Sequence, residues 1–506
     1  MIFRVFSAAV IGLDAQVIET EVDISYGLRS FNIVGLPDKA VEESRERVGA
    51  AIKSSGFLSP YQKPIRVLVN LAPADLKKEG SLYDLPIALS FLAAAKQIRF
   101  DPNNKIFIGE MSLDGKLRPV KGIVSIALLA KERGFSEIIL PKENAPEAAL
   151  VKGIKVIGVE NLIETITYLQ GKKQIPCFKS NIENFFEKPN YSSDLCYIKG
   201  QEYAKRALEI VSSGFHNLLM QGPPGAGKTL LAKAIPSILP QLSFEESLEV
   251  TKIYSIAGLL PKEKPLIKSR PFRSPHHITS EAALIGGGNP PKPGEITLAH
   301  RGVLFLDEFP EFHRDVLESL RQPVEEGKIT ILRAKHQLTF PARFILVAAA
   351  NPCPCGNYRN PEKECTCTPS QITMYKRKLS GPLMDRIDLF IDVPQIKYEK
   401  LTSIDKENSG QKIRKKVEMA RQIQEERFKS QKILANSEMN IPQIQKYCQI
   451  DLKSQGLLRN YVNSGKLSAR GYHRVLKVAR TIADLDNSTD ILYTHLAEAL
   501  MYRVKD

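Results

Sequence analysis

A glycine-rich stretch carries the most specific chemistry in this sequence. It matches the pattern G-x-x-x-x-G-K-[ST], and it lies between an apolar strand-like run, NLLMQ, and a helix-like run, LLAKAI. In such a loop the backbone N–H groups face phosphates, the lysine reaches the β- and γ-phosphates, and the threonine hydroxyl ligates Mg²⁺. This context predicts a site for ATP and Mg²⁺. The site residues are Gly222, Pro223, Pro224, Gly225, Ala226, Gly227, Lys228 and Thr229.

A pair of acids follows a second apolar run, GVLFLDE. Acid pairs at strand ends are often turn residues. Here the pair comes about 80 residues after the glycine-rich loop, which favours a catalytic interpretation. We expect Asp307 to hold Mg²⁺, mostly through water, and Glu308 to polarise the attacking water.

Three further polar residues are candidates for the same site. Asn351 ends the apolar run RFILVAAAN and is placed to orient water against the γ-phosphate. Arg386, in MDRIDL, is interpreted either as a surface ion pair or as an arginine finger that reaches a neighbouring subunit's nucleotide. Arg470 is the candidate nucleotide sensor of the same subunit, with Arg474 as the alternative.

Four of the seven cysteines lie within fifteen residues, spaced C-x-C-x9-C-x-C. Two such pairs that close a nine-residue loop can supply four thiolates to a tetrahedral metal ion. Inert thiols and a redox switch are the alternatives, and structural Zn²⁺ is favoured because a dense cluster in a cytoplasmic chain indicates metal binding. The cluster is Cys353, Cys355, Cys365 and Cys367.

Four segments are expected to position these residues. Residues 1–170 alternate short strands and helices, and 171–194 read as a linker without a clear period. Residues 195–395 form a second α/β block with the glycine-rich loop, and 396–506 read as helices. The fold class is therefore α/β with a C-terminal helical part.

Composition bounds the location and the partner. No apolar stretch reaches the length of a membrane span, and the apolar N-terminus continues as an alternating strand, so we expect a cytoplasmic protein without a membrane partner. The net charge is +15, and residues 396–506 hold 21 Lys and Arg against 13 Asp and Glu. This surplus indicates either a polyanionic partner or a solvated helical face.

The motifs together resemble AAA+ ATPases of the magnesium-chelatase and MCM-like branch, which carry a helix-2 insertion and a β-hairpin. Here 271–302 occupy the insertion and 327–344 the hairpin. The resemblance implies that the hairpin tip points into the pore of a hexameric ring and contacts DNA, while exposed turn chemistry is the alternative. The expected DNA contacts are Arg333, Lys335 and His336.

Residues 108–147 resemble the C-terminal part of the Lon-protease proteolytic domain, through IGEMSLDGKLRPVKGI and PKEN. Lon-type cleavage needs a serine activated by a lysine. The alignment places Leu82 at the serine position and Val124 at the lysine position, while Ser81 and Lys121 are out of register. The resemblance thus implies a Lon-like domain that has lost proteolysis.

A Lon-like domain joined to this ATPase core resembles the ComM/YifB family over nearly the whole chain, through KGQEYAKRALEIVSSGFHNLLMQGPPGAGKT, FRSPHHITS and NPCPCG. The family implies a bacterial ATPase ring. Its ComM branch implies a hexameric DNA helicase that promotes branch migration in homologous recombination and natural transformation, alongside recombination proteins. The alternatives are a protein remodeller or unfoldase with an inactive Lon-like domain, and a magnesium-chelatase-type motor subunit.

Overall fold

The structure is a computed structural model, and it describes residues 2–179, 195–261, 263–288, 291–333, 336–359, 363–378, 381, 383–395, 409–429, 431 and 433–503. The chain divides into two compact units. Unit 1 comprises Met1–Glu187 with Phe244–Ile267, and unit 2 comprises Lys188–Ser243 with Lys268–Asp506. Most of the linker predicted over 171–194 lies outside the described residues. Over the described ranges, every helix is too short or too polar to cross a bilayer.

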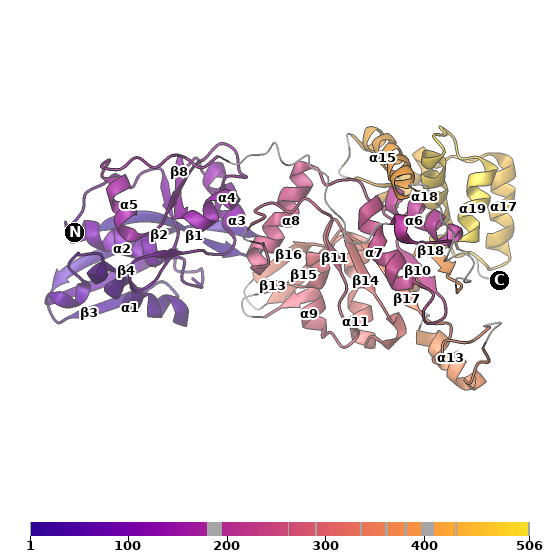
Figure 1. The fold of residues 1–506 in the computed structure, drawn as a ribbon, viewed down its shortest axis with the longest axis horizontal. Coiled ribbons are helices and arrows are strands. Elements are labelled where there is room, and N and C mark those ends of the chain that lie inside the picture. Colours follow the sequence, from indigo (N-terminus) through magenta and orange to yellow (C-terminus); the bar gives the residue numbers. More distant parts are fainter. Residues whose placement is uncertain are drawn as a thin grey trace. The chain divides into compact units, whose positions relative to one another are not determined.

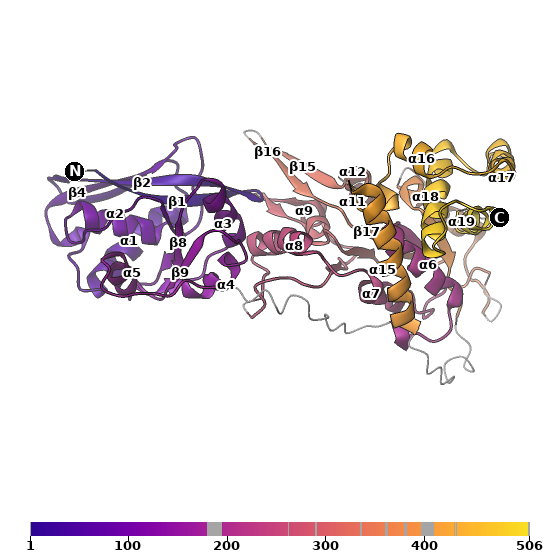
Figure 2. The same cartoon turned by 90° about the horizontal axis from the view of Figure 1, so that it is seen from above.

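Unit 1 is built on a seven-stranded mixed sheet with the order β3-β4-β2-β1-β5-β8-β9. The β1–β2 and β2–β4 pairs are antiparallel, and the other pairs are parallel. In Figure 2 helices α1 and α2 lie below strands β1, β2 and β4, and α3 packs on the opposite face of β1 and β2. In β4 (Ile65–Ala72) alternate residues are fully buried, as expected for a sheet with one face on the core.

The elements of unit 1 have the following bounds. Its strands are β1 (Phe3–Ile11), β2 (Asp14–Tyr26), β3 (Ser30–Val34), β4 (Ile65–Ala72), β5 (Lys105–Phe107), β6 (Glu110–Met111), β7 (Leu117–Arg118), β8 (Glu137–Pro141) and β9 (Lys155–Val159). Its helices are α1 (Lys39–Ser54), α2 (Asp84–Ala94), α3 (Ile123–Glu132), α4 (Ala145–Ala148), α5 (Leu162–Leu169) and α8 (Phe244–Ala257).

Unit 2 is built on a five-stranded parallel sheet with the order β11-β14-β17-β10-β18. Along β17 alternate residues enter different cores. Ile345, Val347 and Ala349 pack with α6, α7 and α18, and the residues between them pack on the opposite face. A parallel sheet covered on both faces needs apolar side chains at every position, which explains the continuous apolar runs in the sequence. Figure 1 shows α6 and α7 beside β10.

The elements of unit 2 have the following bounds. Its strands are β10 (Leu218–Gln221), β11 (Phe272–Arg273), β12 (Gly286–Gly287), β13 (Lys292–Pro293), β14 (Val303–Leu306), β15 (Lys328–Arg333), β16 (His336–Pro341), β17 (Ile345–Ala350) and β18 (Leu389–Asp392). Its helices are α6 (Glu202–Gly214), α7 (Lys228–Ile238), α9 (Glu281–Ile285), α10 (Glu295–Leu298), α11 (Arg314–Ser319), α12 (Arg321–Glu326), α13 (Pro369–Lys378), α15 (Ser409–Phe428), α16 (Ile441–Tyr447), α17 (Leu452–Asn463), α18 (Ala469–Leu485) and α19 (Tyr493–Met501). The predicted α/β fold class with C-terminal helices is confirmed.

Candidate nucleotide site and cysteine cluster

The glycine-rich loop joins β10 to α7 at the carboxyl edge of the parallel sheet. Gly225 and Gly227 have φ values of +77° and +88°, which residues other than glycine adopt only with strain. A Cβ on Gly222 would lie 2.2 Å from the Val393 carbonyl oxygen, so only glycine fits there. Gly227 directly precedes α7, and the free N–H groups of that helix terminus favour anions. This geometry suits a phosphate-binding loop.

Lys228 is folded into this loop. Its Nζ donates to the carbonyl oxygens of Gly222 and Pro223 at 2.6 and 2.9 Å and to Asn351 Oδ1 at 3.1 Å. Burial lowers the pKa of Lys228, and the charge of Asp307 counteracts this effect. A buried ammonium that donates only to neutral oxygens is prepared for an anionic partner. The structure thus brings Lys228 and Asn351 together.

Thr229 and Asp307 offer oxygen ligands beside Lys228. Thr229 Oγ1 donates to Asp307 Oδ2 at 2.8 Å, although the two residues come from α7 and from the end of β14. A hydroxyl and a carboxylate at the foot of a phosphate-binding loop are hard oxygen donors of the kind that Mg²⁺ prefers. These residues therefore fit the ion that the loop implies.

Glu308 has a partner that the sequence reasoning missed. His277 Nδ1 lies 3.1 Å from Glu308 Oε2, and the His277 ring also packs edge-on against Phe312. His277 follows β11 in the insertion, so the two residues lie about 30 positions apart in the chain. The paired histidines in FRSPHHITS were a visible signal, but spacing alone does not indicate which carboxylate they meet.

The candidate arginines lie in three different environments. Arg386, at the end of the 3-10 turn Met384–Arg386, pairs with Glu325 of α12, with Nε and Oε2 3.0 Å apart. Arg474 donates to the buried carboxylate of Asp388. Arg470 is exposed in the first turn of α18. None of these pairings places an arginine at the glycine-rich loop of its own chain.

The β15–β16 hairpin carries the proposed DNA contacts. Arg333 and His336 form the last registered pair of this antiparallel ribbon. Lys335 lies outside the described residues. The hairpin therefore lies within residues 327–344, the range that the sequence predicts for it.

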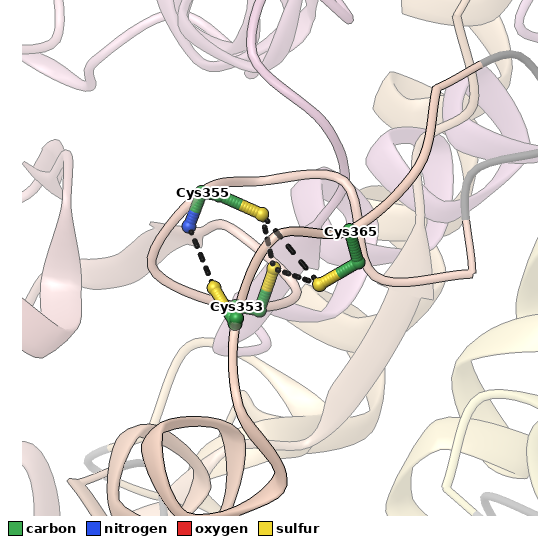
Figure 3. A group of neighbouring side chains, drawn as sticks. Cys353, Cys355 and Cys365 are labelled. Carbon is green, nitrogen blue, oxygen red and sulfur yellow. Dashed lines mark hydrogen bonds between the residues drawn. The ribbon is translucent and has the colours of Figure 1, made fainter.

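The four clustered cysteines follow β17 in the chain and converge. Figure 3 shows Cys353, Cys355 and Cys365 with their sulfurs turned toward one another. Cys353 Sγ lies 3.4 Å from Cys355 Sγ and 3.7 Å from Cys365 Sγ, and the last two sulfurs lie 3.6 Å apart. With Cys367, all four sulfurs lie within 4.8 Å of one another. Disulfide sulfurs are about 2.05 Å apart, so these are free thiols. Four sulfurs bound tetrahedrally at ~2.3 Å would be ~3.8 Å apart, so the cluster fits a metal ion.

The region that resembles Lon carries aliphatic side chains at both aligned positions. Leu82 packs into the core of unit 1, and Val124 is fully buried in α3. Ser81 donates to Glu110. Helix α8 lies against α3: Ser255 accepts from the N–H of Gly122 at 3.0 Å and donates to Glu147. Among these described residues no serine–lysine pair replaces the missing dyad.

Family models match most of the chain. The model described as "Magnesium chelatase, subunit ChlI" matches residues 194–401, that described as "Subunit ChlI of Mg-chelatase" matches 20–144, and that of the ChlI C-terminal part matches 407–503. The parallel sheet, its phosphate-binding loop and these matches define a magnesium-chelatase-like AAA+ protein.

Relatives specify the family further. The chain is 43% identical to "Competence protein ComM" of Haemophilus influenzae, over 99% of this chain and 97% of that protein. It is 42% identical to YifB of Escherichia coli, over 99% and 97%. The magnesium-chelatase 38 kDa subunit of Rhodobacter capsulatus is 25% identical over 31% of this chain and 49% of its own. The chain therefore belongs to the ComM/YifB family of magnesium-chelatase-like AAA+ proteins, which indicates ATPase activity.

Proposed function

We propose that this protein is an ATP-driven motor that acts on DNA as a homo-hexameric ring in the cytoplasm. Its work would be helicase or branch-migration activity during homologous recombination and natural transformation, beside recombination proteins. The observation that carries the proposal is the cluster of Lys228, Asn351, Thr229 and Asp307 at one sheet edge. It occurs in a chain that aligns with a competence protein over nearly its full length.

Each residue of this cluster has a role in hydrolysis. Lys228 binds the phosphates in place of the carbonyl oxygens that it contacts here, and Thr229 and Asp307 hold Mg²⁺. Asn351 orients the attacking water. Glu308 polarises that water once its carboxylate has separated from His277. Arg386 arrives from the neighbouring subunit, and Arg470 senses the nucleotide from α18.

Grip on DNA is assigned to the hairpin residues Arg333, Lys335 and His336. Contacts of this kind are mainly to phosphates, so binding would tolerate sequence changes and weaken with salt. The net charge of +15 supports a polyanionic partner. The cofactors are ATP and Mg²⁺, with structural Zn²⁺ at the four cysteines.

Two other functions use the same ATPase core. A protein remodeller or unfoldase would pull on unfolded chains, and a magnesium-chelatase-type motor would serve porphyrin metallation. Neither is favoured by an additional observation: the magnesium-chelatase 38 kDa subunit of Rhodobacter capsulatus aligns with 31% of this chain, whereas the competence protein aligns with 99% of it.

The test is ATP hydrolysis by the purified full chain, alone and with single-stranded DNA, a three-way DNA junction or unfolded casein. We expect stimulation by DNA and a loss of about 10²-fold in Lys228→Ala, because that variant removes the cation that stabilises the phosphates. Lys233→Ala is the matched control, since Lys233 is exposed on the same helix. Stimulation by casein and not by DNA would make the protein a remodeller instead.

A further inference from the structure

The cysteine cluster directly adjoins the phosphate-binding loop. Gly356 lies inside the cluster loop with φ +81°, and a Cβ there would be 2.4 Å from Cδ and 2.7 Å from Cγ of Pro224. Pro224 belongs to the glycine-rich loop, and its ring cannot rotate away. The two loops are therefore in van der Waals contact, and only glycine at position 356 permits it.

A second connection runs through Asn351. Its side chain accepts from Lys228, and the carbonyl of the residue before it, Ala350, accepts from the N–H of Gly222 at 3.2 Å. Cys353 follows two residues later and is fully buried. The first thiol of the cluster is thus fixed to the same short segment that contacts both ends of the glycine-rich loop.

The far end of the cysteine segment returns to Asn351. Tyr375 of α13 is buried. Burial raises its pKa to about 12, against a hydrogen bond with the Asn351 backbone that lowers it. The segment from Cys353 to Tyr375 therefore starts and ends at Asn351. In Figure 1 α13 projects from the rest of unit 2.

The sulfurs themselves are arranged to receive a metal ion. Two backbone N–H groups point at them: that of Cys355 lies 3.4 Å from Cys367 Sγ, and that of Tyr358 lies 3.3 Å from Cys353 Sγ. Such N–H groups stabilise negative sulfur, as a metal-bound thiolate requires. Four thiolates in tetrahedral order favour Zn²⁺ among the common ions.

We propose that Zn²⁺ on Cys353, Cys355, Cys365 and Cys367 clamps the phosphate-binding loop, through Gly356 on Pro224 and through Asn351 on Lys228. This inference rests on the ATP site of the proposed function. It assigns the metal a positioning role in nucleotide binding, beyond holding its own loop together. Loss of the metal releases the Gly356 contact and leaves Asn351 attached only to β17. ATP is then bound more weakly.

The test measures zinc and nucleotide affinity in the same samples of full-length protein. Zinc and iron per chain are measured by plasma mass spectrometry, and affinity by titration with N-methylanthraniloyl-ATP and Mg²⁺. We expect one zinc per chain. We expect Cys365→Ser to lose it and to raise the Kd by about tenfold or more, as for lost supports of a binding site. A zinc-selective chelator should act likewise, and added Zn²⁺ should restore affinity.

A second variant separates the clamp from simple unfolding. Gly356→Ala should keep zinc and still raise the Kd several-fold, because its methyl group displaces Pro224. Gly465→Ala is the matched control: its φ is +73°, but nothing lies within 4 Å of the added Cβ. It shares the backbone strain and should leave the Kd unchanged.

These measurements test the zinc clamp without DNA, so their result does not depend on whether the protein acts on DNA. Zinc-free wild-type protein, iron in place of zinc, or an unchanged Kd in Cys365→Ser and Gly356→Ala would overturn it. A zinc-dependent Kd in a protein whose ATP turnover ignores DNA would support the clamp while contradicting the DNA motor.

Discussion

The sequence identifies Glu308 as a candidate catalytic residue, and the structure adds its partner, His277. Its carboxylate is paired with His277 and is therefore turned toward the insertion. Polarising a water requires a free carboxylate oxygen near the γ-phosphate. If Glu308 polarises the attacking water as proposed, its pair with His277 competes with that role.

We expect His277→Ala to raise ATP turnover in the absence of DNA. The Glu308 side chain is 57% exposed and that of His277 29%, and exposed pairs are worth about 0–1 kcal/mol. The increase should therefore be at most about fivefold, and the ratio of DNA-stimulated to basal turnover should fall. Steady-state ATP hydrolysis with and without DNA measures both.

His313→Ala is the control for this variant. His313 lies in the same region but pairs with Asp315 instead of Glu308, so its removal should leave basal turnover unchanged. Lower turnover in His277→Ala would contradict the prediction and give His277 a positive role in the reaction.

Arg470 and Arg474 lie one turn apart on α18, and the structure distinguishes them. Burial by itself raises the pKa of Asp388. The charge of Arg474, the neighbouring His216 and a hydrogen bond from the N–H of Asn217 outweigh burial and hold that pKa well below its usual range. Removing one partner of a buried ion pair leaves an uncompensated charge. Arg474 therefore has a structural role, because its guanidinium neutralises the buried Asp388 carboxylate.

We therefore expect Arg474→Ala to destabilise unit 2 by about 3 kcal/mol or more, as measured by urea unfolding. Arg470→Ala should unfold at the wild-type urea concentration, because Arg470 is exposed, yet should lower kcat for ATP. If Arg470→Ala hydrolyses ATP normally, Arg470 is not the nucleotide sensor.

At the scale of elements, α8 belongs to unit 1 although it lies between α7 and β11 in the chain. Its residue Ser255 contacts Glu147 and the N–H of Gly122, and Lys252 pairs with Asp14 at 2.8 Å. The contacts lie beside Val124, where a Lon-type lysine would stand. A helix that lies between α7 and β11 in the sequence thus completes the fold of unit 1.

Glu147 makes this packing pH-dependent. Burial raises its pKa, against hydrogen bonds from Ser255 and from the N–H of Val124 that lower it. The folded state therefore holds the proton more tightly than the unfolded chain, whose glutamates titrate near pH ~4.3. The stability that Glu147 contributes is complete below that pH, and it is lost as the pH rises through the folded-state pKa.

We expect Glu147→Gln, which keeps an acceptor oxygen without the charge, to raise the melting temperature of unit 1 at pH 8. The gain should be a few degrees, since ~1 kcal/mol shifts a domain of this size by roughly 2–4 °C. It should vanish near pH 4. Calorimetry identifies the transition of unit 1 as the one that ATP does not shift.

Glu143→Gln is the control, because Glu143 is exposed in the 3-10 turn Lys142–Asn144 that directly precedes α4. A gain at pH 8 that equals the gain at pH 4 would contradict a charge effect and indicate better packing instead.

The sequence predicted those elements whose constraints are local. The glycine-rich loop, β17 and the four cysteines are defined by short patterns, because phosphate binding, a doubly covered strand and a tetrahedral site each require particular residues at close spacing. Side-chain partners distant in the chain were not predictable. The His277–Glu308 and Arg474–Asp388 pairs and the place of α8 depend on tertiary packing, which leaves no periodic trace in the sequence.

At the scale of the whole molecule, the proposed ring makes each ATP site a joint product of two chains. Arg386 pairs with Glu325 within its own chain, and an arginine finger must exchange such a partner for a neighbour's phosphate. If it does, a site needs Lys228 from one subunit and Arg386 from the next. Two variants that lack different halves of the site can then restore each other.

We expect Lys228→Ala and Arg386→Ala proteins to be inactive alone and to regain ATP turnover when co-expressed with two different tags and purified through both. Random mixing leaves about a quarter of the interfaces with both residues intact, because a closed ring uses the same interface throughout. A mixture of Lys228→Ala with the double variant Lys228→Ala/Arg386→Ala contains no intact site and should stay inactive. Mixed rings that recover no turnover would show that Arg386 does not act on the neighbouring subunit's nucleotide.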